Sequence, residues 1–510
     1  KFSPSFGSRQ FGSTSHAVIH TCRILQKMVR ISVNHALNGR ELLSKAPFSS
    51  YDRIESLLNQ VELVLGQPVG ALISHLGQIL QPHEFIKSCG LSDGDSVSAL
   101  PNVKEMVVEV ATTDTALAVV KGGGDIATWG CPLEGGDITP VHRHLKHGVT
   151  HVCATRSAFA ALTGQDVVVS WGNPEGGGTA PPSVTEMSEH KVQRIFATQG
   201  AFAVLRDNGS VVAWGNPRLG GDFEHVEQEL ASGVQRVFAN KVAFAALKDD
   251  GSVVAWGLAV GGGELHDPTV CNVGDIYCTD YAFAALKHNG SVVTWGDQER
   301  GGDSNAVQHH IYCNVQEVCS NSDAFAVLKT NGQVVTWGNP ECGGDSTAVK
   351  AELAEGVLQV YSSLDAFAAV KGDGSTVVWG HPDFGGDASG VAELLASDVT
   401  RICATGGAFA ALKSDGSVVT WGHPAYGGDA APVQEQLMSG VCSIYANFKA
   451  FAAVKENGSV VAWGSEDCGG VLTHSTQVQL MSNVRIIYPA KQAFAAIKSN
   501  GKVVVWGQSF

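Results

Sequence analysis

The chain has few charged residues, no long apolar run and no paired cysteines of the metal-binding type. No apolar stretch of the 510 residues approaches 18 in length, so we expect no membrane-spanning helix. None of the twelve cysteines forms a C-x-x-C pair, the usual spacing in zinc and redox motifs. Charged residues make up only 16% of the chain, and residues 102–510 carry a net charge of −17. Because nucleic-acid binding needs clustered Lys and Arg, we expect no nucleic-acid partner.

The first 27 residues contain neither methionine nor any acidic residue. Two interpretations remain open: an acid-poor leader of the transit type, disordered in the protein, or upstream sequence that is not translated. We favour the second, because Met28 is the first methionine and stands directly before the first predicted strand.

Residues 28–101 carry the pattern of a small α+β domain. Apolar and polar residues alternate from Val29 to Val33, Asn38-Gly39 predicts a turn, and residues 41–44 return as a second strand. Ser49 and Asp52 have the spacing of a capping box before an apolar stripe of helical period, which predicts a helix. Short strands are expected at 71–75 and 96–100.

This ββαββ order resembles the ubiquitin-like (β-grasp) fold. Ser74 stands where ubiquitin carries the central isoleucine of its recognition patch, and Pro101-Asn102-Val103 follows the last strand in place of a terminal Gly-Gly. The resemblance therefore implies a built-in domain that links the protein to ubiquitin pathways, without conjugation through this module.

Residues 102–510 are built from ten repeats. Every tryptophan is followed by glycine, and successive tryptophans lie 39 to 43 residues apart: Trp129, Trp171, Trp214, Trp256, Trp295, Trp337, Trp379, Trp421, Trp463 and Trp506. Periods of this length indicate propellers, solenoids or arrays. We expect each unit to contain three strands and a short helix.

The segment Ala201–Gly215 shows how one unit is built. Asn208-Gly209 lies between two apolar runs, which predicts a β-hairpin with a two-residue type I′ turn. Pairing outward from that turn sets Ala203 opposite Trp214 and Phe202 opposite Gly215, so each ring faces a small partner. Both faces are apolar, so we expect neighbouring units to cover both.

The recurring pattern A-F-A-A-L-K-x-D-G-S-V-V-x-W-G, followed by G-G-D, resembles the repeat of the regulator of chromosome condensation family. That resemblance implies a mainly β protein: a β-propeller of ten ~42-residue repeats over residues 102–510. Family propellers commonly have seven blades. A ring of ten, an open superhelix and more than one closed body are therefore all open, and we favour one closed ring.

Three cysteines, Cys153, Cys319 and Cys403, occupy a repeat position that elsewhere holds Phe or Tyr, so we expect them to act as small core residues. Free buried thiols suit a reducing compartment, and we expect a cytoplasmic protein, with the nucleus as the alternative.

Two clusters could suggest a metal site. Aspartates follow the glycine pair in six repeats, but an Asp before a short helix is a preferred N-cap, which is the favoured interpretation: Asp137, Asp222, Asp303, Asp345, Asp387 and Asp429. His142, His144, His147 and His151 cluster in the first unit, where most of them are expected to face solvent. We expect no metal and no cofactor.

The loop between Trp-Gly and Gly-Gly varies from repeat to repeat. At equivalent places it carries aromatic residues and arginine, which are favoured at protein interfaces; the candidate binding residues are Arg218, Leu219, Arg300, Phe384 and Tyr426. The alternative is that these side chains pack on the adjacent unit. Because equivalent loops lie on the same face of a propeller, we expect one face to bind protein partners.

We expect a non-catalytic protein-interaction scaffold, since no nucleophile stands apart from the repeats. The family resemblance also implies a guanine-nucleotide-exchange-like regulator as an alternative. A third possibility is an inhibitor or enzyme that acts from the propeller face.

Overall fold

The computed structural model divides the chain into two compact units, residues 1–101 and 102–510. It describes residues 107–507 except 122, 147, 187–188, 266–269, 491 and 500–502. In the first unit it describes residues 28–35, 41–49, 54, 56–57, 60–61, 69–74, 79–80, 86, 91 and 96–101. The expected leader at residues 1–27 lies outside the described residues.

The first unit contains one five-stranded mixed sheet in the order β2-β1-β5-β3-β4. Its strands are β1 (Met28–His35), β2 (Glu41–Ser49), β3 (Val69–Ser74), β4 (Ile79–Leu80) and β5 (Ser96–Pro101). β1 runs parallel to β5 and antiparallel to β2. Helical residues Ile54, Leu57 and Val61 are fully buried in one core with Ile31 and Val33.

The predicted cap of this helix falls at the end of a strand. β2 continues through Ser49, whose Cα is paired with that of Met28, and Ile54 is the first residue described as helical. Residues 50–53, where the predicted helix begins, lie outside the described residues, so the capping box stays a prediction.

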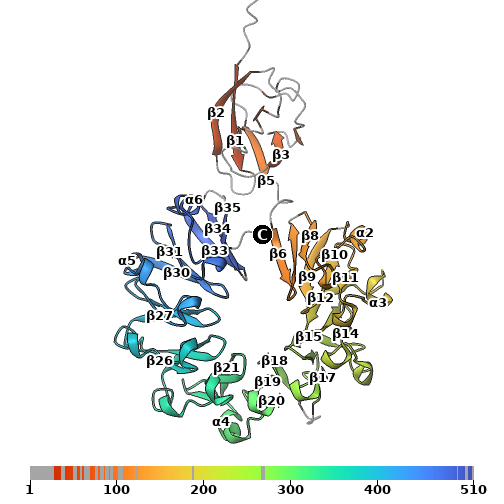
Figure 1. Ribbon diagram of the computed structural model, residues 1–510, viewed down its shortest axis with the longest axis vertical. Helices are drawn as coiled ribbons and strands as arrows, with labels where there is room; N and C mark the ends of the chain where they lie inside the picture. The colour runs from red at the N-terminus through yellow and green to blue at the C-terminus, as the bar shows by residue number, and fades with distance from the viewer. Residues whose placement is uncertain are drawn as a thin grey trace, which may run out of the picture. The chain divides into compact units, whose positions relative to one another are not determined.

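The second unit is mainly β. Its described residues form ten separate three-stranded antiparallel sheets, arranged radially as in a β-propeller (Figure 1). The first strands contact one another along the inner side of the row: β6 (Val107–Thr112), β9 (Val149–Ala154), β12 (Val192–Ala197), β15 (Val234–Ala239), β18 (Val273–Cys278), β21 (Val315–Ser320), β24 (Val357–Ser362), β27 (Val399–Ala404), β30 (Val441–Ala446) and β33 (Val484–Ala490).

The second and third strands of each sheet form the hairpin. The second strands are β7 (Ala116–Lys121), β10 (Ala158–Thr163), β13 (Ala201–Arg206), β16 (Ala243–Lys248), β19 (Ala282–Lys287), β22 (Ala324–Lys329), β25 (Ala366–Lys371), β28 (Ala408–Lys413), β31 (Ala450–Lys455) and β34 (Ala493–Lys498). The third strands are β8 (Ile126–Gly130), β11 (Val168–Gly172), β14 (Val211–Gly215), β17 (Val253–Gly257), β20 (Val292–Gly296), β23 (Val334–Gly338), β26 (Thr376–Gly380), β29 (Val418–Gly422), β32 (Val460–Gly464) and β35 (Val503–Gly507). We number the repeats 1 to 10 in this order.

The predicted hairpin register is wrong by one residue. Phe202 lies opposite Trp214, and Ala201 opposite Gly215. The Arg206 amide donates to the Ser210 carbonyl, which leaves a three-residue loop with Gly209 in the left-handed region at φ +75°. Asn208 Oδ1 accepts from the Ser210 amide at 3.0 Å. The D/N-G-S sequence thus builds an Asx-type turn with a bulge, instead of a two-residue turn.

Short helical turns connect the sheets, where one short helix per repeat was expected. Nine 3₁₀ turns follow the third strands: η2 (Pro132–Glu134), η3 (Pro174–Gly176), η4 (Pro217–Leu219), η6 (Ala259–Gly261), η7 (Gln298–Arg300), η9 (Pro340–Cys342), η11 (Pro382–Phe384), η13 (Pro424–Tyr426) and η15 (Glu466–Cys468). Further turns follow the glycine pairs: η5 (Glu224–Val226), η8 (Asn305–Val307), η10 (Thr347–Val349), η12 (Ser389–Val391) and η14 (Ala431–Val433). The short α-helices are α2 (His142–Leu145), α3 (Pro182–Thr185), α4 (Gln308–Ile311), α5 (Gln434–Leu437) and α6 (His474–Gln479).

Adjacent sheets share an apolar core, and the same contact recurs along the row. In repeat 6, Trp337 stacks on Phe325 with ring centroids 5.3 Å apart, and its indole N–H donates to the Gly301 carbonyl of repeat 5 at 2.9 Å. Every described tryptophan from repeat 2 to repeat 10 makes the equivalent hydrogen bond. The expected cover of both hairpin faces is therefore provided by neighbouring repeats.

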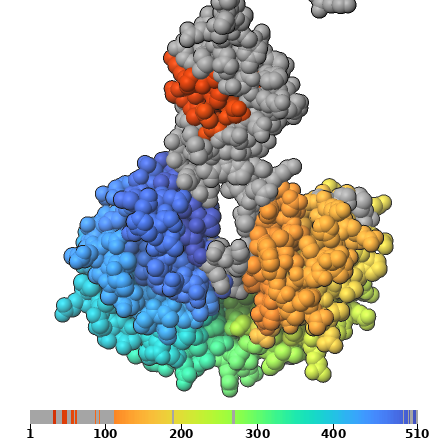
Figure 2. Space-filling view, turned by 45° about the horizontal axis from the view of Figure 1, so that its top comes forward, coloured from red at the N-terminus to blue at the C-terminus, as the bar shows by residue number. Residues whose placement is uncertain are grey.

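The two ends of the row do not repeat this contact. Nine apolar clusters join consecutive sheets of the described chain, and none joins repeat 10 to repeat 1. Trp129 of repeat 1 is 51% exposed and Val505 of repeat 10 is 67% exposed. The orange and blue ends of the unit face each other across an opening (Figure 2).

The expected closed ring is therefore not found among the described residues. Each internal tryptophan uses a glycine carbonyl from the loop that follows the preceding sheet.

Candidate functional site

One surface of the repeat unit is formed by the 3₁₀ turns after Trp-Gly and by the loops that join first and second strands. We call it the loop face. In repeats 2 to 9 a buried polar side chain ties the loop to its turn: Thr405 Oγ1 donates to the Tyr426 carbonyl at 2.9 Å, and Ser363 Oγ donates to the Phe384 carbonyl at 2.9 Å. Backbone hydrogen bonds join consecutive loops, as from the Gly406 amide to the Phe448 carbonyl. The loop face is thus a continuous, hydrogen-bonded surface.

The structure places the five candidate binding residues on this face. Leu219, Arg300, Phe384 and Tyr426 end η4, η7, η11 and η13, and all four are half-buried. Arg218 is the residue before Leu219 and is exposed. Each of the four side chains packs on a loop and keeps one side open, and a role for them in binding stays a prediction.

Phe384 and Tyr426 are brought together in an aromatic cluster. Their ring centroids are 6.2 Å apart, and Tyr426 meets Phe448 of the next repeat edge-on at 5.9 Å. His381 and His423 flank these rings at 5.3 and 5.4 Å. We define the aromatic cluster by these five side chains.

The rings of the aromatic cluster pack directly against the backbone of Gly407, where there is no room for a side chain. A Cβ at Gly407 would lie 2.9 Å from the Tyr426 ring and 3.3 Å from Phe384. Lys449 Nζ lies 5.2 Å from the centre of the Tyr426 ring, within the range of a cation–π contact. Phe448 is the most open member, at 39% exposed, so it can lose water when a partner binds.

Repeats 5 and 6 carry charge on the same face instead of aromatic rings. The guanidinium of Arg300 lies 4.2 Å from the centre of the Tyr281 ring, and its Nε is 3.4 Å from Asp323 Oδ1. Burial raises the pKa of Asp323 above its usual value, although Arg300 opposes that shift. Arg300 is therefore largely engaged with its neighbours, and Leu219 on repeat 3 stands apart from both groups.

The loops surround a hollow of about 390 Å³ on the loop face. Asp280, Ser322, Leu364, Gly406 and Phe448 belong to its lining, each from the loop of a different repeat. Its lining changes from a carboxylate on repeat 5 to an aromatic ring on repeat 9. Such a surface offers one apolar anchor point beside several hydrogen-bonding groups.

The six repeated aspartates are engaged with the backbone. Each accepts a hydrogen bond from the amide two residues later, as Asp387 does from Ser389 at 2.8 Å. This bond to the backbone N–H, together with that of the Ser389 hydroxyl, lowers the pKa of Asp387. The predicted N-cap position is wrong by one residue. In five of the six repeats the N-cap is the residue after the aspartate, as Ala388 is for η12, and the aspartate accepts from the amide of the first residue of the 3₁₀ turn.

Of the histidines that cluster in the sequence between positions 142 and 151, those that the structure describes do not come together. His142 and His144 lie exposed on α2, whereas His151 lies on the inner strand β9 and contacts Glu109. His147 lies outside the described residues. Among the residues that the structure describes, no three His, Cys, Asp or Glu side chains are grouped as for a metal ion.

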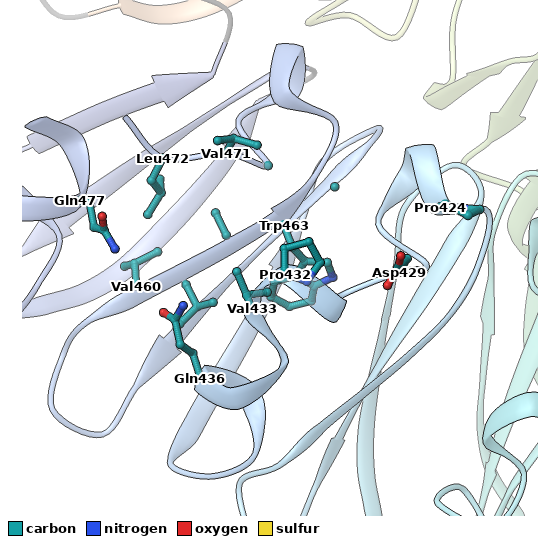
Figure 3. Close-up of a pocket in the computed structure, with 14 residues that line it drawn as sticks. Pro424, Asp429, Pro432, Val433, Gln436, Val460, Trp463, Val471, Leu472 and Gln477 are labelled. Carbon is teal, nitrogen blue, oxygen red and sulfur yellow. The ribbon is translucent and has the colours of Figure 1, made fainter. Parts of the chain in front are cut away.

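A second crevice, of about 270 Å³, lies between the turns of repeats 8 and 9 (Figure 3). Pro432, Val433, Val471 and Leu472 line it beside Trp463. The sequence departs from the repeat pattern here, because Val471 stands where six other repeats carry an aspartate after the glycine pair. Trp463 already donates to the Gly427 carbonyl, so the crevice offers mainly apolar contact.

Four side chains at this site were not predicted from the sequence: Phe448, Lys449, His381 and His423. The predicted binding residues all lie in the loop after Trp-Gly, whereas Phe448 lies in the loop between the first and second strands. A signal was present: at its position the other repeats carry polar or smaller residues such as Gln199, Ser322 and Gly406.

Within the described residues, no helix is long and apolar enough to cross a bilayer. Comparisons with protein-family models and with curated proteins each gave no match.

Similar solved structures include Prp20p from Saccharomyces cerevisiae, with 17% identity over 46% of this chain and 72% of that one at a TM-score of 0.31. Human WBSCR16 shares 18% identity over 55% of this chain and 81% of its own, at a TM-score of 0.30. The ectodomain of the receptor kinase CR4 from Physcomitrella patens shares 13% identity over 54% and 73%, at a TM-score of 0.32. Because all three scores are far below 0.5, the account of the fold rests on the sheets of this chain: mainly β, with repeated three-stranded antiparallel sheets in a radial, propeller-like row.

Proposed function

We propose that the protein is a non-catalytic interaction scaffold that binds a protein partner on its loop face, in the cytoplasm. The observation that carries the proposal is the aromatic cluster of repeats 7 to 9, in which three rings from different repeats share one half-exposed surface. Phe448 is its outermost ring and serves as the anchor. Aromatic anchors beside a polar rim are the usual centre of a protein interface.

The aromatic cluster is the better candidate within the loop face, because two of the other predicted binding residues are held against their own loops. Leu219 and Arg300 are held by their own loops, since a Cβ at Gly200 would meet Leu219 at 2.8 Å and Arg300 lies over Tyr281. Phe448 adds an exposed ring beside Tyr426 and the hollow. We therefore propose that Phe384, Tyr426 and Phe448 provide most of the contact, with Arg218, Leu219 and Arg300 at the rim.

The test is affinity capture with the full chain as bait, comparing Phe448→Ala with Gln199→Ala. Gln199 occupies the equivalent loop position on repeat 3, so its variant controls for a loop substitution outside the aromatic cluster. We expect Phe448→Ala to lose the partner and Gln199→Ala to retain it, with unchanged melting temperatures. Equal capture by both variants would rule out the aromatic cluster as the anchor.

We also propose that the first unit is ubiquitin-like and makes the protein an adaptor to ubiquitin pathways. The support is its strand order β2-β1-β5-β3-β4, with β1 parallel to β5, and the buried helix residues Ile54, Leu57 and Val61. Titration of the full chain with an isolated ubiquitin-receptor domain tests this proposal. No binding at millimolar receptor concentration would contradict the adaptor role, and it would leave the loop face unaffected.

A further inference from the structure

Three side chains on the inner strands of repeats 1 and 2 form a connected line. Glu109 Oε1 of β6 lies 2.7 Å from His151 Nδ1 of β9. His151 Nε2 lies 3.2 Å from Cys153 Sγ, two residues along the same strand. The second oxygen of Glu109 accepts the Val152 amide at 2.9 Å, which fixes the carboxylate in place.

Each member has the role that an activated thiol requires. A thiol is a weak nucleophile until it loses its proton, and a neighbouring imidazolium that is oriented by a third group favours the thiolate. The Val152 amide holds Glu109, Glu109 holds one imidazole nitrogen, and the other nitrogen faces the sulfur. The hydrogen bonds to Cys153 and Glu109 raise the pKa of His151 to about 10, so the imidazole readily holds the proton.

The other charged groups nearby do not compete for the thiol. On the strands packed against β9, Arg194 stands at the equivalent position of β12, Lys121 ends β7, and β10 carries no titratable side chain. Cys153 Sγ also donates to the Ile195 carbonyl at 3.4 Å, so an uncharged backbone group is its other polar neighbour. His151 and Cys153 are both half-buried, so each residue keeps part of its surface open to solvent.

The chain contains its own comparison, because Cys319 and Cys403 occupy the same strand position in repeats 6 and 8. Both are half-buried, and Cys403 Sγ donates to the Ile444 carbonyl at 3.2 Å as Cys153 does to Ile195. Glu317 and Arg401 stand where His151 stands. Burial raises the pKa of Cys319, which has no imidazole beside it, to about 11.

We propose that Glu109, His151 and Cys153 form a reactive-thiol site whose substrates are small disulfides. A disulfide suits the site, because its cleavage needs only a thiolate and a proton donor. Acyl transfer would further need donors for an oxyanion, and the Val152 amide beside the thiol already donates to Glu109.

The reaction is thiol–disulfide exchange. Cys153 loses its proton to solvent beside the imidazolium of His151, the thiolate attacks one sulfur of the disulfide, and the S–S bond breaks with its electron pair on the other sulfur. The leaving thiolate then receives the proton from His151. Cys153 is oxidised to a mixed disulfide, and the substrate is reduced to one free thiol. Repeats without the histidine do not carry out this step at neutral pH.

The test uses the reduced full chain and oxidised glutathione at about pH 6.5, with mixed disulfides mapped by peptide mass spectrometry. We expect Cys153 to react at least about tenfold faster than Cys319 or Cys403, because near pH 7 an ordinary thiol is only a few per cent thiolate. Equal rates at the three cysteines of the unmodified chain would overturn the proposal, whatever any variant does.

Variants separate the acid–base role from packing. His151→Asn and Glu109→Gln should slow Cys153 about tenfold at pH 6.5 and have little effect at about pH 10, where the thiol ionises without help. A loss of rate that is the same at both pH values would contradict the acid–base role. In the converse experiment, Gln359→Glu with Arg401→His places the same pair beside Cys403 and should accelerate its reaction; an unchanged rate would show that the three groups do not suffice.

Discussion

The tryptophans differ in burial according to their place in the row, and this difference has a measurable consequence. Trp337 is 4% exposed, stacked on Phe325 and hydrogen-bonded to the preceding repeat, whereas Trp129 is 51% exposed. Trp337→Ala should therefore destabilise the protein by roughly 3–5 kcal/mol, because the cavity lies between two sheets. Trp129→Ala should cost roughly 1 kcal/mol or less.

Urea denaturation followed by circular dichroism measures both changes. The two variants remove the same side chain from equivalent strand positions, so each controls for the other. A cost at Trp129 as large as that at Trp337 would mean that the first sheet is covered in solution, as in a closed ring.

His151 predicts a pH-dependent contribution to stability. In the folded protein the pKa of His151 is raised from 6.5 to about 10. The hydrogen bond to Cys153 is the largest cause, and the hydrogen bond to Glu109 is the second. A raised pKa means that the stabilisation is complete below about pH 6.5 and is lost as the pH rises through about 10. The gap in urea midpoint between the native chain and His151→Asn should be widest near pH 6 and narrow toward pH 10. A gap that widens with rising pH would refute the assigned protonation state.

At the scale of single elements, the glycine pair sets the distance between sheets. Gly301 has φ +99°, and a Cβ there would lie 2.5 Å from the Phe325 ring of the next sheet. We expect Gly301→Ala to destabilise the protein by more than about 2 kcal/mol, through backbone strain and the contact with the ring.

Gly390 in η12 provides the matched control. No atom would lie within 4 Å of its Cβ, and its φ is not positive. Gly390→Ala should be neutral or stabilising by up to about 1 kcal/mol, because it restricts the unfolded chain. Thermal unfolding of both variants measures the two changes in stability. Similar losses of stability at Gly301 and Gly390 would contradict the role assigned to the glycine pair.

The elements could be predicted from the sequence where the signal is local and repeated. Trp-Gly at constant spacing and apolar runs around D/N-G predict the hairpins, and Asp after Gly-Gly predicts a short turn, with its N-cap placed one residue too early. The register could not be predicted, because Asn-Gly suits both a two-residue turn and a three-residue loop with Gly209 at φ +75°. The Asx bond from Asn208 to Ser210 selects the longer loop, and it places Phe202 opposite Trp214.

At the scale of the whole repeat unit, the sequence shows which positions differ between repeats, but it does not predict which of these side chains contact one another. Phe384 and Tyr426 were identified because they vary within a constant frame. Phe448 reaches them only through the packing of repeat 9 on repeat 8, and the pairing of Glu109 with His151 likewise joins two repeats. Ring closure could not be predicted either, because it depends on small rotations between sheets that add up over all of them.

The central claim is that a protein partner binds the aromatic cluster on the loop face. Hydrogen–deuterium exchange of the full chain with and without its captured partner tests it most directly, since it reports which backbone amides become protected. We predict protection in residues 381–385, 423–427 and 447–449, which contain the five aromatic-cluster residues. Protection confined to the crevice around Val471, or to residues 28–101, with no change in these three segments, would contradict the account.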